Sequence, residues 1–317
     1  MSTLRSRAGG VRGARGLAAV VPVTAALLLG GCVIGDVDRD GETAQETAGQ
    51  STTARTPDPT TDPTTSPAPT SSASSSPQAG ALEVPEGSGS AGVALLDDGD
   101  LRTGGSLADL ADAAWSTSKV PVAVAALTNA GADDQNGLDG LMRQAITVSD
   151  NDAAEALWAS LGDEAAAAAA TQDVLRQGGD TTTTVPAQKR RAEFSTFGQT
   201  TWALGDQARF AAGLRCVAGS APVLDAMGQV AAGQDYGLGR LDGARFKGGW
   251  GPGEDGTYLV RQFGLIPADD GTMVPVAVAA TAPDGSYASA QVVLDEVAGS
   301  LRDTVAGAHG VPAEGGC

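Results

Sequence analysis

A serine and a lysine three residues apart, Ser116 and Lys119, begin an apolar stretch of this 317-residue chain. The spacing of its apolar residues predicts a helix over 115–129, and residues three apart share one face of a helix. Burial in such a helix favours the neutral amine of Lys119, which can then accept the hydroxyl proton of Ser116. Backbone N–H groups at the start of the helix can stabilise an oxyanion. The pair could therefore serve as nucleophile and base in acyl transfer.

The rest of the composition excludes most other catalytic groups. The chain has one histidine, His309, which lies in a glycine-rich tail and leaves almost no material for a Ser-His-Asp or Cys-His mechanism. No His/Cys cluster has the spacing of zinc ligands, and no glycine-rich phosphate loop with a lysine follows a strand. We therefore expect neither a metal nor a cofactor, and a hydrolase built here would use a lysine or a carboxylate as its base.

Two further short motifs follow in the sequence. Ser149-Asp-Asn151 opens a second predicted helix, and Lys247-Gly-Gly-Trp-Gly251 ends a predicted strand and enters a turn. Each has an ordinary explanation when taken singly, as a helix N-cap and as a hairpin with a solvated lysine. Taken in order with Ser116-Thr-Ser-Lys119, they resemble the Ser-x-x-Lys, Ser-Asp-Asn and Lys-Thr-Gly motifs of class A β-lactamases and penicillin-binding proteins. The resemblance covers about residues 90–305.

The resemblance implies a catalytic role for three residues. Ser116 would attack a carbonyl carbon and Lys119 would accept its proton. Ser149 would bridge Lys119 and Lys247 and relay a proton to the leaving nitrogen. An acyl-enzyme on Ser116 is the intermediate that this arrangement implies.

The resemblance also implies how substrate would be bound. Asn151 would bind the amide of the substrate, and Lys247 would attract a substrate carboxylate. The backbone N–H groups of Ser116 and Trp250 would form the oxyanion hole, with Gly249 beside them on the strand. No role in this set requires a cofactor.

Three departures from the family pattern bear on activity. Gly248 stands where the family has Thr or Ser, so one hydroxyl contact to a substrate carboxylate is lost. Only 33 residues separate Ser116 from Ser149, which shortens one wall of the cleft. Between Asn151 and Gln199 there is no Glu-x-x-Leu-Asn motif. Glu193 is the nearest candidate for this role, but its setting, Ala-Glu-Phe-Ser, is wrong. Without that glutamate an acyl-enzyme should hydrolyse slowly, so efficient β-lactamase turnover is not expected.

Two functions from different classes remain open. The first is a monomeric serine hydrolase acting on amide or ester bonds of a small-molecule or peptidoglycan-like substrate, in the manner of a D,D-peptidase or an esterase. The second is a catalytically inert lipoprotein that binds a cell-wall fragment or a protein partner. Retention of Lys119 and Lys247 in an arginine-rich chain favours chemistry. Gly248 and the missing glutamate favour the inert protein.

The predicted elements give a mixed α/β (α+β) fold. An apolar run predicts a first strand, a helical middle follows, and three strands and a helix end the chain. The predicted strands cover 91–97, 244–247, 257–266 and 273–280, and the predicted helices cover 115–129, 149–161, 164–177, 199–214 and 289–305. We expect an antiparallel sheet built from both chain ends and flanked by helices, with a helical subdomain inserted and the site between the two parts.

The N-terminal segment predicts export. Four arginines precede a 13-residue apolar run, Leu17 to Leu29, which is too short to remain as a membrane-spanning helix. Leu29-Gly-Gly-Cys32 resembles the bacterial lipobox, which implies removal of residues 1–31 and attachment of fatty acyl groups to Cys32. We expect a lipoprotein on the outer face of the cell membrane, with a Thr/Ser/Pro-rich tether over 32–85 and one domain over 86–317.

Charge and cysteine content limit the partners. Removal of residues 1–31, which carry four arginines and no acid, would change the net charge from −18 to −22. A chain that acidic repels nucleic acid and anionic lipid, so attachment to the membrane would depend on the lipid alone. Outside the cytoplasm the two remaining thiols, Cys216 and Cys317, are expected to form a disulfide.

Overall fold

The computed structural model describes residues 82–85, 87–131, 135–313 and 317. The predicted signal segment, Cys32 and the tether up to residue 81 lie outside the described residues. Within the described part of the chain, no helix is long and apolar enough to cross a membrane. Leu82 is buried, and its backbone N–H donates to the carbonyl of Thr103 over 3.0 Å.

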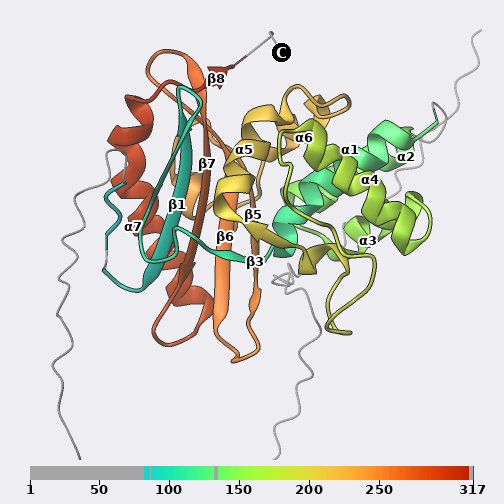
Figure 1. Cartoon of the computed structure of the whole chain (residues 1–317), viewed down its shortest axis with the longest axis horizontal. Helices are drawn as coiled ribbons and strands as arrows, with labels where there is room; N and C mark the ends of the chain where they lie inside the picture. Colours follow the sequence, from blue (N-terminus) through green and yellow to red (C-terminus); the bar gives the residue numbers. More distant parts are fainter. Residues whose placement is uncertain (1–81, 86, 132–134, 314–316) are drawn as a thin grey trace, which may run out of the picture. The chain divides into compact units, whose positions relative to one another are not determined.

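The central sheet joins strands from both ends of the folded part of the chain (Figure 1). Its order is β2-β1-β7-β6-β5. Every pair is antiparallel, as the sequence predicts. The strands are β1 (Ser90–Asp97), β2 (Asp100–Gly104), β5 (Arg245–Pro252), β6 (Tyr258–Pro267) and β7 (Thr272–Thr281), and the short β8 (Val311–Pro312) pairs with β7. Asp98 and Gly99 both have positive φ and close the tight turn between β1 and β2.

The two faces of the sheet carry separate apolar cores. In β7, alternate side chains face opposite sides, so Val276 and Val278 belong to one core and Ala277 and Ala279 to the other. The C-terminal helix α7 (Tyr287–Ala306) covers the first face with Val293, Leu294, Val297 and Leu301. Helix α5 (Leu204–Leu214) packs on the second face, which is also the face toward the helical part of the chain.

The helical part is inserted between β2 and β5. It contains the 3₁₀ turn η1 (Trp115–Ser118), which continues directly into α1 (Lys119–Asn129). Around α1 lie α2 (Gln135–Thr147), α3 (Asn151–Ser160), α4 (Glu164–Gln177) and α6 (Ala221–Met227), with the 3₁₀ turn η2 (Phe197–Gln199). The 3₁₀ turn η3 (Gly237–Arg240) packs instead on α7, at the first face of the sheet. The short strands β3 (Ala111–Ala113) and β4 (Thr201–Ala203) pair with each other and connect this part to the sheet.

The structure differs from the sequence-based elements mainly at their ends. Strand β5 continues through the glycine-rich segment to Pro252 instead of turning after Lys247. Pairing with β6 over eight positions supports a segment whose own strand propensity is low. Helix α5 begins at Leu204, not 199, because β4 precedes it. Helix α2 and strand β2 lie in stretches for which we predicted no element.

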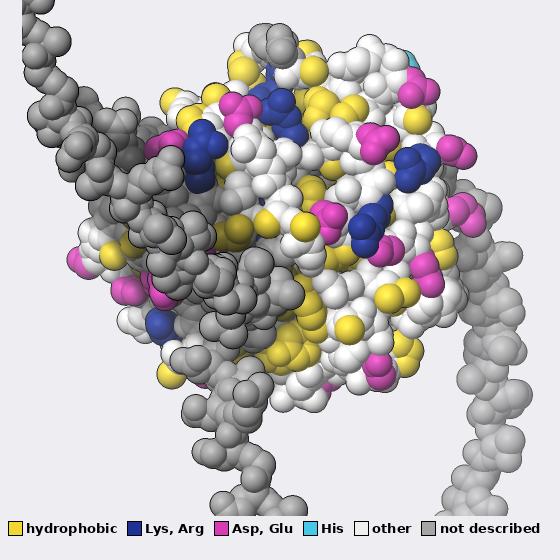
Figure 2. All heavy atoms as spheres, turned by 180° about the vertical axis from the view of Figure 1, so that it is seen from behind, with side chains coloured by type: hydrophobic (Ala, Val, Ile, Leu, Met, Phe, Trp, Pro, Cys, Tyr) yellow, Lys and Arg dark blue, Asp and Glu magenta, His cyan; other side chains and the backbone are white. Residues whose placement is uncertain are grey.

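The surface of the described part mixes both signs of charge. Figure 2 shows acidic and basic side chains interspersed with apolar ones on the face seen from behind. Cys216 and Cys317 are joined by a disulfide, with their Cα atoms 5.4 Å apart.

Candidate active site

Ser116 lies in the buried turn η1, at the point where the chain enters α1. The turn is fixed by its own hydroxyls, since Thr117 Oγ1 donates to the carbonyl of Ala114 and Ser118 Oγ donates to the carbonyl of Trp115. Trp115 has a φ of +50°, a conformation that is costly for a large L-residue. Strained backbone of this kind persists only where its surroundings determine it, and here it directly precedes the candidate nucleophile.

A buried arginine on the central sheet supports the nucleophile turn. Arg261 on β6 is fully buried and donates to Gln207 Oε1 over 2.6 Å and to the carbonyl of Trp202 over 2.7 Å. Gln207 in turn donates to Thr117 Oγ1 over 2.9 Å. Burial lowers the pKa of Arg261 to about 10, which still leaves the guanidinium charged at neutral pH. The sheet is thus connected to the nucleophile turn through side chains with polar partners.

Ser149 lies between the two lysines. Lys247 Nζ donates to Ser149 Oγ over 2.8 Å, and Lys119 Nζ lies 3.3 Å from the same oxygen. Lys119 Nζ also contacts the Ser149 carbonyl at 2.6 Å and Asn151 Oδ1 at 2.7 Å. Both lysines and Ser149 are essentially without solvent exposure. The structure therefore brings together four of the residues that the sequence selected.

The backbone at Ser149 explains how one residue offers two oxygens to Lys119. Ser149 has a φ of +57°, the left-handed region, which turns the chain sharply before α3 begins. Asp150 then caps the helix, accepting the N–H of Ala153 over 2.7 Å. The N-cap explanation of the Ser-Asp-Asn segment is thus correct for Asp150, while Ser149 and Asn151 bond to Lys119.

Strand β5 is the edge strand that passes the nucleophile turn. A Cβ atom on Gly249 would lie 2.8 Å from the backbone nitrogens of Ser116 and Thr117, so only glycine permits this approach. A Cβ atom on Gly251 would likewise come too close to the ring of Trp115. The Trp250 side chain packs on the opposite face, stacked on Tyr287 with ring centroids 5.2 Å apart. Only the main chain of Trp250 can therefore serve the site, as its implied oxyanion role requires.

The loop after α4 forms the other side of the nucleophile turn, and Gln199 organises it. Gln199 Oε1 accepts the backbone N–H groups of Arg190 and Arg191 at 3.1 and 2.7 Å. Its Nε2 donates to the carbonyls of Arg191, Phe194 and Ser195 at 3.0 to 3.1 Å. One buried amide thus satisfies five main-chain groups of the loop.

Aromatic contacts join this loop to the nucleophile turn. The Phe194 ring meets the Trp115 ring edge-on, with centroids 5.0 Å apart. The Arg191 guanidinium lies over the Phe194 ring and donates to the carbonyl of Pro252 at the end of β5. These contacts pack against Trp115 and hold it in its strained conformation.

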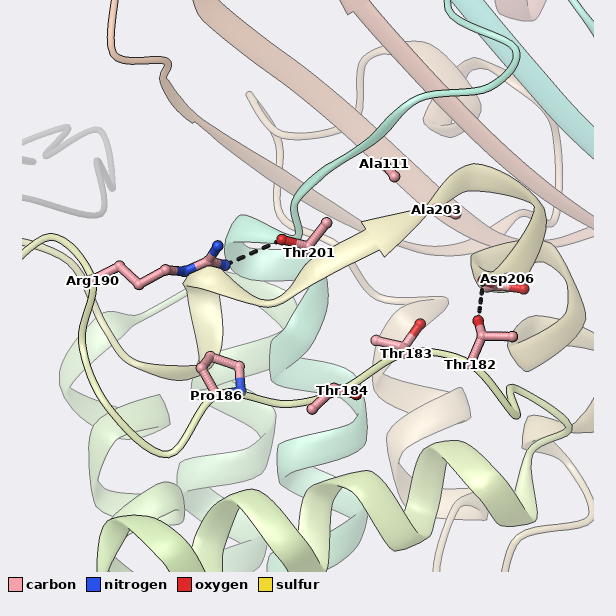
Figure 3. Close-up of a pocket in the computed structure, with 9 residues that line it drawn as sticks. All are labelled: Ala111, Thr182, Thr183, Thr184, Pro186, Arg190, Thr201, Ala203 and Asp206. Carbon is pink, nitrogen blue, oxygen red and sulfur yellow. Dashed lines mark hydrogen bonds between the residues drawn. The ribbon is translucent and has the colours of Figure 1, made fainter.

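The loop also borders a polar pocket of about 420 Å³ between itself and β3–β4 (Figure 3). Its lining residues are Ala111, Thr182, Thr183, Thr184, Pro186, Arg190, Thr201, Ala203 and Asp206. Two of the polar contacts join pairs within the lining, from Thr182 to Asp206 and from Arg190 to Thr201. These side chains thus connect the loop to β4 and to the first turn of α5.

Glu193, the nearest sequence candidate for a deacylating base, is half exposed on this loop and pairs with Arg191 at 3.2 Å. Hydrogen bonds from its own backbone N–H and from Arg191 lower its pKa. Its charge is thus satisfied at the surface, away from the lysines. The expectation that its setting does not suit the role agrees with this geometry.

Several residues that hold the site in place are not predicted by the sequence motifs. Arg261 and Gln207 carry no motif, although a lone arginine within the apolar stretch of 258–266 is a signal that could have been followed. Gln199 stands in no motif and only marks the start of the predicted helix over 199–214. His309 lies apart, with its side chain largely exposed near Asp270.

No protein-family model matches the sequence, and no curated protein matches it either. Solved structures with a similar fold include the TLA-3 extended-spectrum β-lactamase, at a TM-score of 0.54 and 14% identity over 70% of this chain and 95% of that one. A class A β-lactamase from Bacteroides cellulosilyticus aligns at 0.55 and 14% identity over 69% and 93%. A β-lactamase from Chitinophaga pinensis aligns at 0.54 and 16% over 68% and 94%. The chain therefore has the fold of the class A β-lactamases, a scaffold of serine hydrolases.

Proposed function

We propose that this chain is an envelope-anchored serine hydrolase that is acylated at Ser116 and turns over slowly. The observation that supports this most is the position of the Ser149 hydroxyl between two buried lysine amines, one of which, Lys119, directly follows the nucleophile turn. Two buried amines are costly to maintain unless they have a use, because burial disfavours charge. A domain that only binds would have no need of both.

Acylation would proceed through the amine of Lys119. A neutral amine has two N–H groups and one lone pair, so Lys119 must give up one of its three oxygen contacts before its lone pair can accept the Ser116 proton. The longest contact, 3.3 Å to Ser149 Oγ, is the natural one to give up. Lys247 donates to Ser149 Oγ, and the Ser149 proton can then point toward the leaving nitrogen.

The chemical steps follow from this chain of hydrogen bonds. Ser116 Oγ attacks the substrate carbonyl carbon while its proton passes to Lys119 Nζ. The proton then moves through Ser149 Oγ to the leaving nitrogen as the C–N bond breaks, and the acyl group remains on Ser116. The N–H groups of Ser116 and Trp250 would hold the oxyanion, and Lys247 would attract a substrate carboxylate.

The proposed setting is the outer face of the cell membrane. The lipobox-like Cys32 would carry the anchor, and the Thr/Ser/Pro-rich tether predicted over 32–85 would hold the domain away from the bilayer. Amide and ester bonds of cell-wall peptides are the substrates within reach of such a protein. Loss of the family hydroxyl at Gly248 and the surface position of Glu193 favour slow turnover over efficient β-lactam hydrolysis.

The test is covalent labelling of the purified protein, expressed from the full sequence, with a penicillin. We expect the intact mass to increase by one penicillin within minutes, and the increase to be absent from Ser116→Ala. Peptide mapping should place the adduct on the peptide that contains Ser116. Loss of β-lactam from solution should be slow relative to formation of the adduct.

The opposite result has a clear meaning. If neither a penicillin nor an activated ester labels the folded protein, Ser116 is not a working nucleophile. The inert lipoprotein that binds a cell-wall fragment then becomes the better description.

A further inference from the structure

Glu155 lies on α3, one helical turn after Asn151. Residues four apart share a face of a helix, and helical side chains lean toward the N-terminal end. Glu155 therefore leans back toward Asn151, whose Oδ1 accepts a hydrogen bond from Lys119 Nζ at 2.7 Å. The side chain is half-buried, so water can reach it.

The charged groups that face Glu155 come from four elements. Lys119 belongs to α1, Lys189 to the loop after α4, and Glu164 to the start of α4, while Asp152 shares α3 with Glu155. Burial raises the pKa of Glu155 above the ordinary 4.5, with Lys189 and Lys119 opposing that rise and the two acidic groups adding to it. A carboxylate whose basicity is increased in this way accepts a proton more readily than a surface carboxylate does.

The neighbouring carboxylates have other partners. Glu193 is paired with Arg191. Glu164 accepts the indole N–H of Trp158 at 3.2 Å, and Asp150 caps α3. Asp152 is exposed in the first turn of α3. Glu155 is thus the carboxylate best placed to act beside Lys119.

We propose that Glu155 is the general base that activates the water which hydrolyses the acyl group from Ser116. The inference rests on the proposed function, since it concerns the second half of the same reaction. It places the base on helix α3, whereas the motif of the family places its glutamate in the loop that follows the helices.

The step balances without any further reagent. Water attacks the acyl carbonyl carbon as its proton passes to the Glu155 carboxylate, and the C–Oγ bond to Ser116 breaks. The protonated Glu155 then returns this proton, through Lys119, to Ser116 Oγ, and the acyl group leaves as a carboxylic acid. Glu155 is again a carboxylate and Lys119 a neutral amine, which restores the starting state.

The experiment separates formation of the acyl-enzyme from its decay. Excess penicillin is removed after labelling, and intact mass is followed with time for the wild type, Glu155→Gln and Asp152→Asn. We expect the wild type and Asp152→Asn to lose the adduct at the same rate, and Glu155→Gln to lose it about 100-fold more slowly. Formation of the adduct should differ less than about threefold among the three.

A pH profile distinguishes a base from a structural carboxylate. Glu155 must be ionised to act, so the decay rate of the wild type should rise with pH through a midpoint above 4.5, and the rise should be absent from Glu155→Gln. Glu155→Asp retains a carboxylate and should recover part of the rate. Circular dichroism and the thermal midpoint should show that each variant is folded.

The outcomes are distinguishable. Decay that is equally fast in Glu155→Gln and the wild type overturns this inference and leaves the proposed function intact. Failure of the folded wild type to form any adduct overturns the proposed function, and this inference with it.

Discussion

The two sides of the nucleophile turn are both rich in hydrogen bonds, but they use them differently. On the lysine side, which we define as Lys119, Ser149, Asn151 and Lys247, side chains from three elements bond to one another around a shared hydroxyl. On the loop side, residues 178–200, the key side chain bonds to the main chain of its own loop. Side chains that bond to one another can exchange protons, whereas those that bond to the main chain hold it in place.

This difference assigns separate tasks to the two sides. The lysine side holds the groups whose protonation can change, and the loop side holds Trp115 in its strained conformation through Phe194. Variants on the lysine side should therefore change rates more than stability. Variants on the loop side should change stability more than rates.

Ser149→Ala should give the largest effect on rate. It removes the oxygen between Lys119 and Lys247 and interrupts the chain of hydrogen bonds, so acylation by a penicillin should slow about 100- to 1,000-fold. The main-chain contact from the Ser149 carbonyl to Lys119 is retained, so the free energy of unfolding should change by less than about 1 kcal/mol. Time-resolved intact mass and urea denaturation measure the two quantities.

Ser160→Ala, at the C-terminal end of α3, is the matched control. Its hydroxyl donates to the carbonyl of Leu157, and so acylation should be unchanged. A Ser149→Ala protein that is acylated at the wild-type rate would remove the relay from the mechanism and break the comparison.

Gln199→Ala should give the reverse pattern. It leaves five main-chain groups of the loop without their partner, and the free energy of unfolding should fall by about 2–4 kcal/mol. Acylation of the protein that remains folded should slow less than about tenfold, because the lysine side is untouched. Gln188→Ala, at an exposed position of the same loop, should shift stability by no more than about 0.5 kcal/mol.

Equal losses of stability in the two glutamine variants would show that the loop does not depend on the Gln199 amide. A loss of acylation as large as that in Ser149→Ala would show that the loop side belongs to the catalytic machinery.

The lysine side could be predicted from the sequence, and the loop side could not. Ser116, Lys119, Ser149 and Lys247 stand in short motifs with a chemical meaning, and their order along the chain carries the information. Gln199 has no local signal, because its five bonds depend on how the loop closes. Arg261 is similar, since its partners lie 54 to 149 residues away in sequence.

The fold divides in the same way. Apolar periodicity located the core strands and α7, whose side chains pack into continuous layers. It located only the start of β5, up to Lys247, because glycines then occupy the face toward the nucleophile turn and the apolar signal disappears. The sequence is least informative where the backbone itself approaches the site.

Gly248→Thr should give the smallest effect on the acylation rate, and the one that is most specific to the substrate. A Cβ atom at 248 would lie 3.6 Å from Tyr236 Oη and 3.8 Å from Gln262 Cγ, which is ordinary contact, so the variant should fold. A β-branched residue in place of glycine in a paired strand should stabilise the protein by up to about 1 kcal/mol. If the added hydroxyl reaches a substrate carboxylate, acylation by a carboxylate-bearing β-lactam should rise about 3- to 10-fold.

Gly249→Ala, one residue along the strand, is the matched contrast. Its Cβ would lie 2.8 Å from the Ser116 nitrogen, so it should slow acylation while Gly248→Thr accelerates it. Comparison of a β-lactam with an uncharged ester isolates the carboxylate, because only the β-lactam should respond to the hydroxyl at 248. Faster acylation by both acyl donors would instead mean that the strand had become more rigid. The hydroxyl missing at 248 would then not be what limits the binding of a substrate carboxylate.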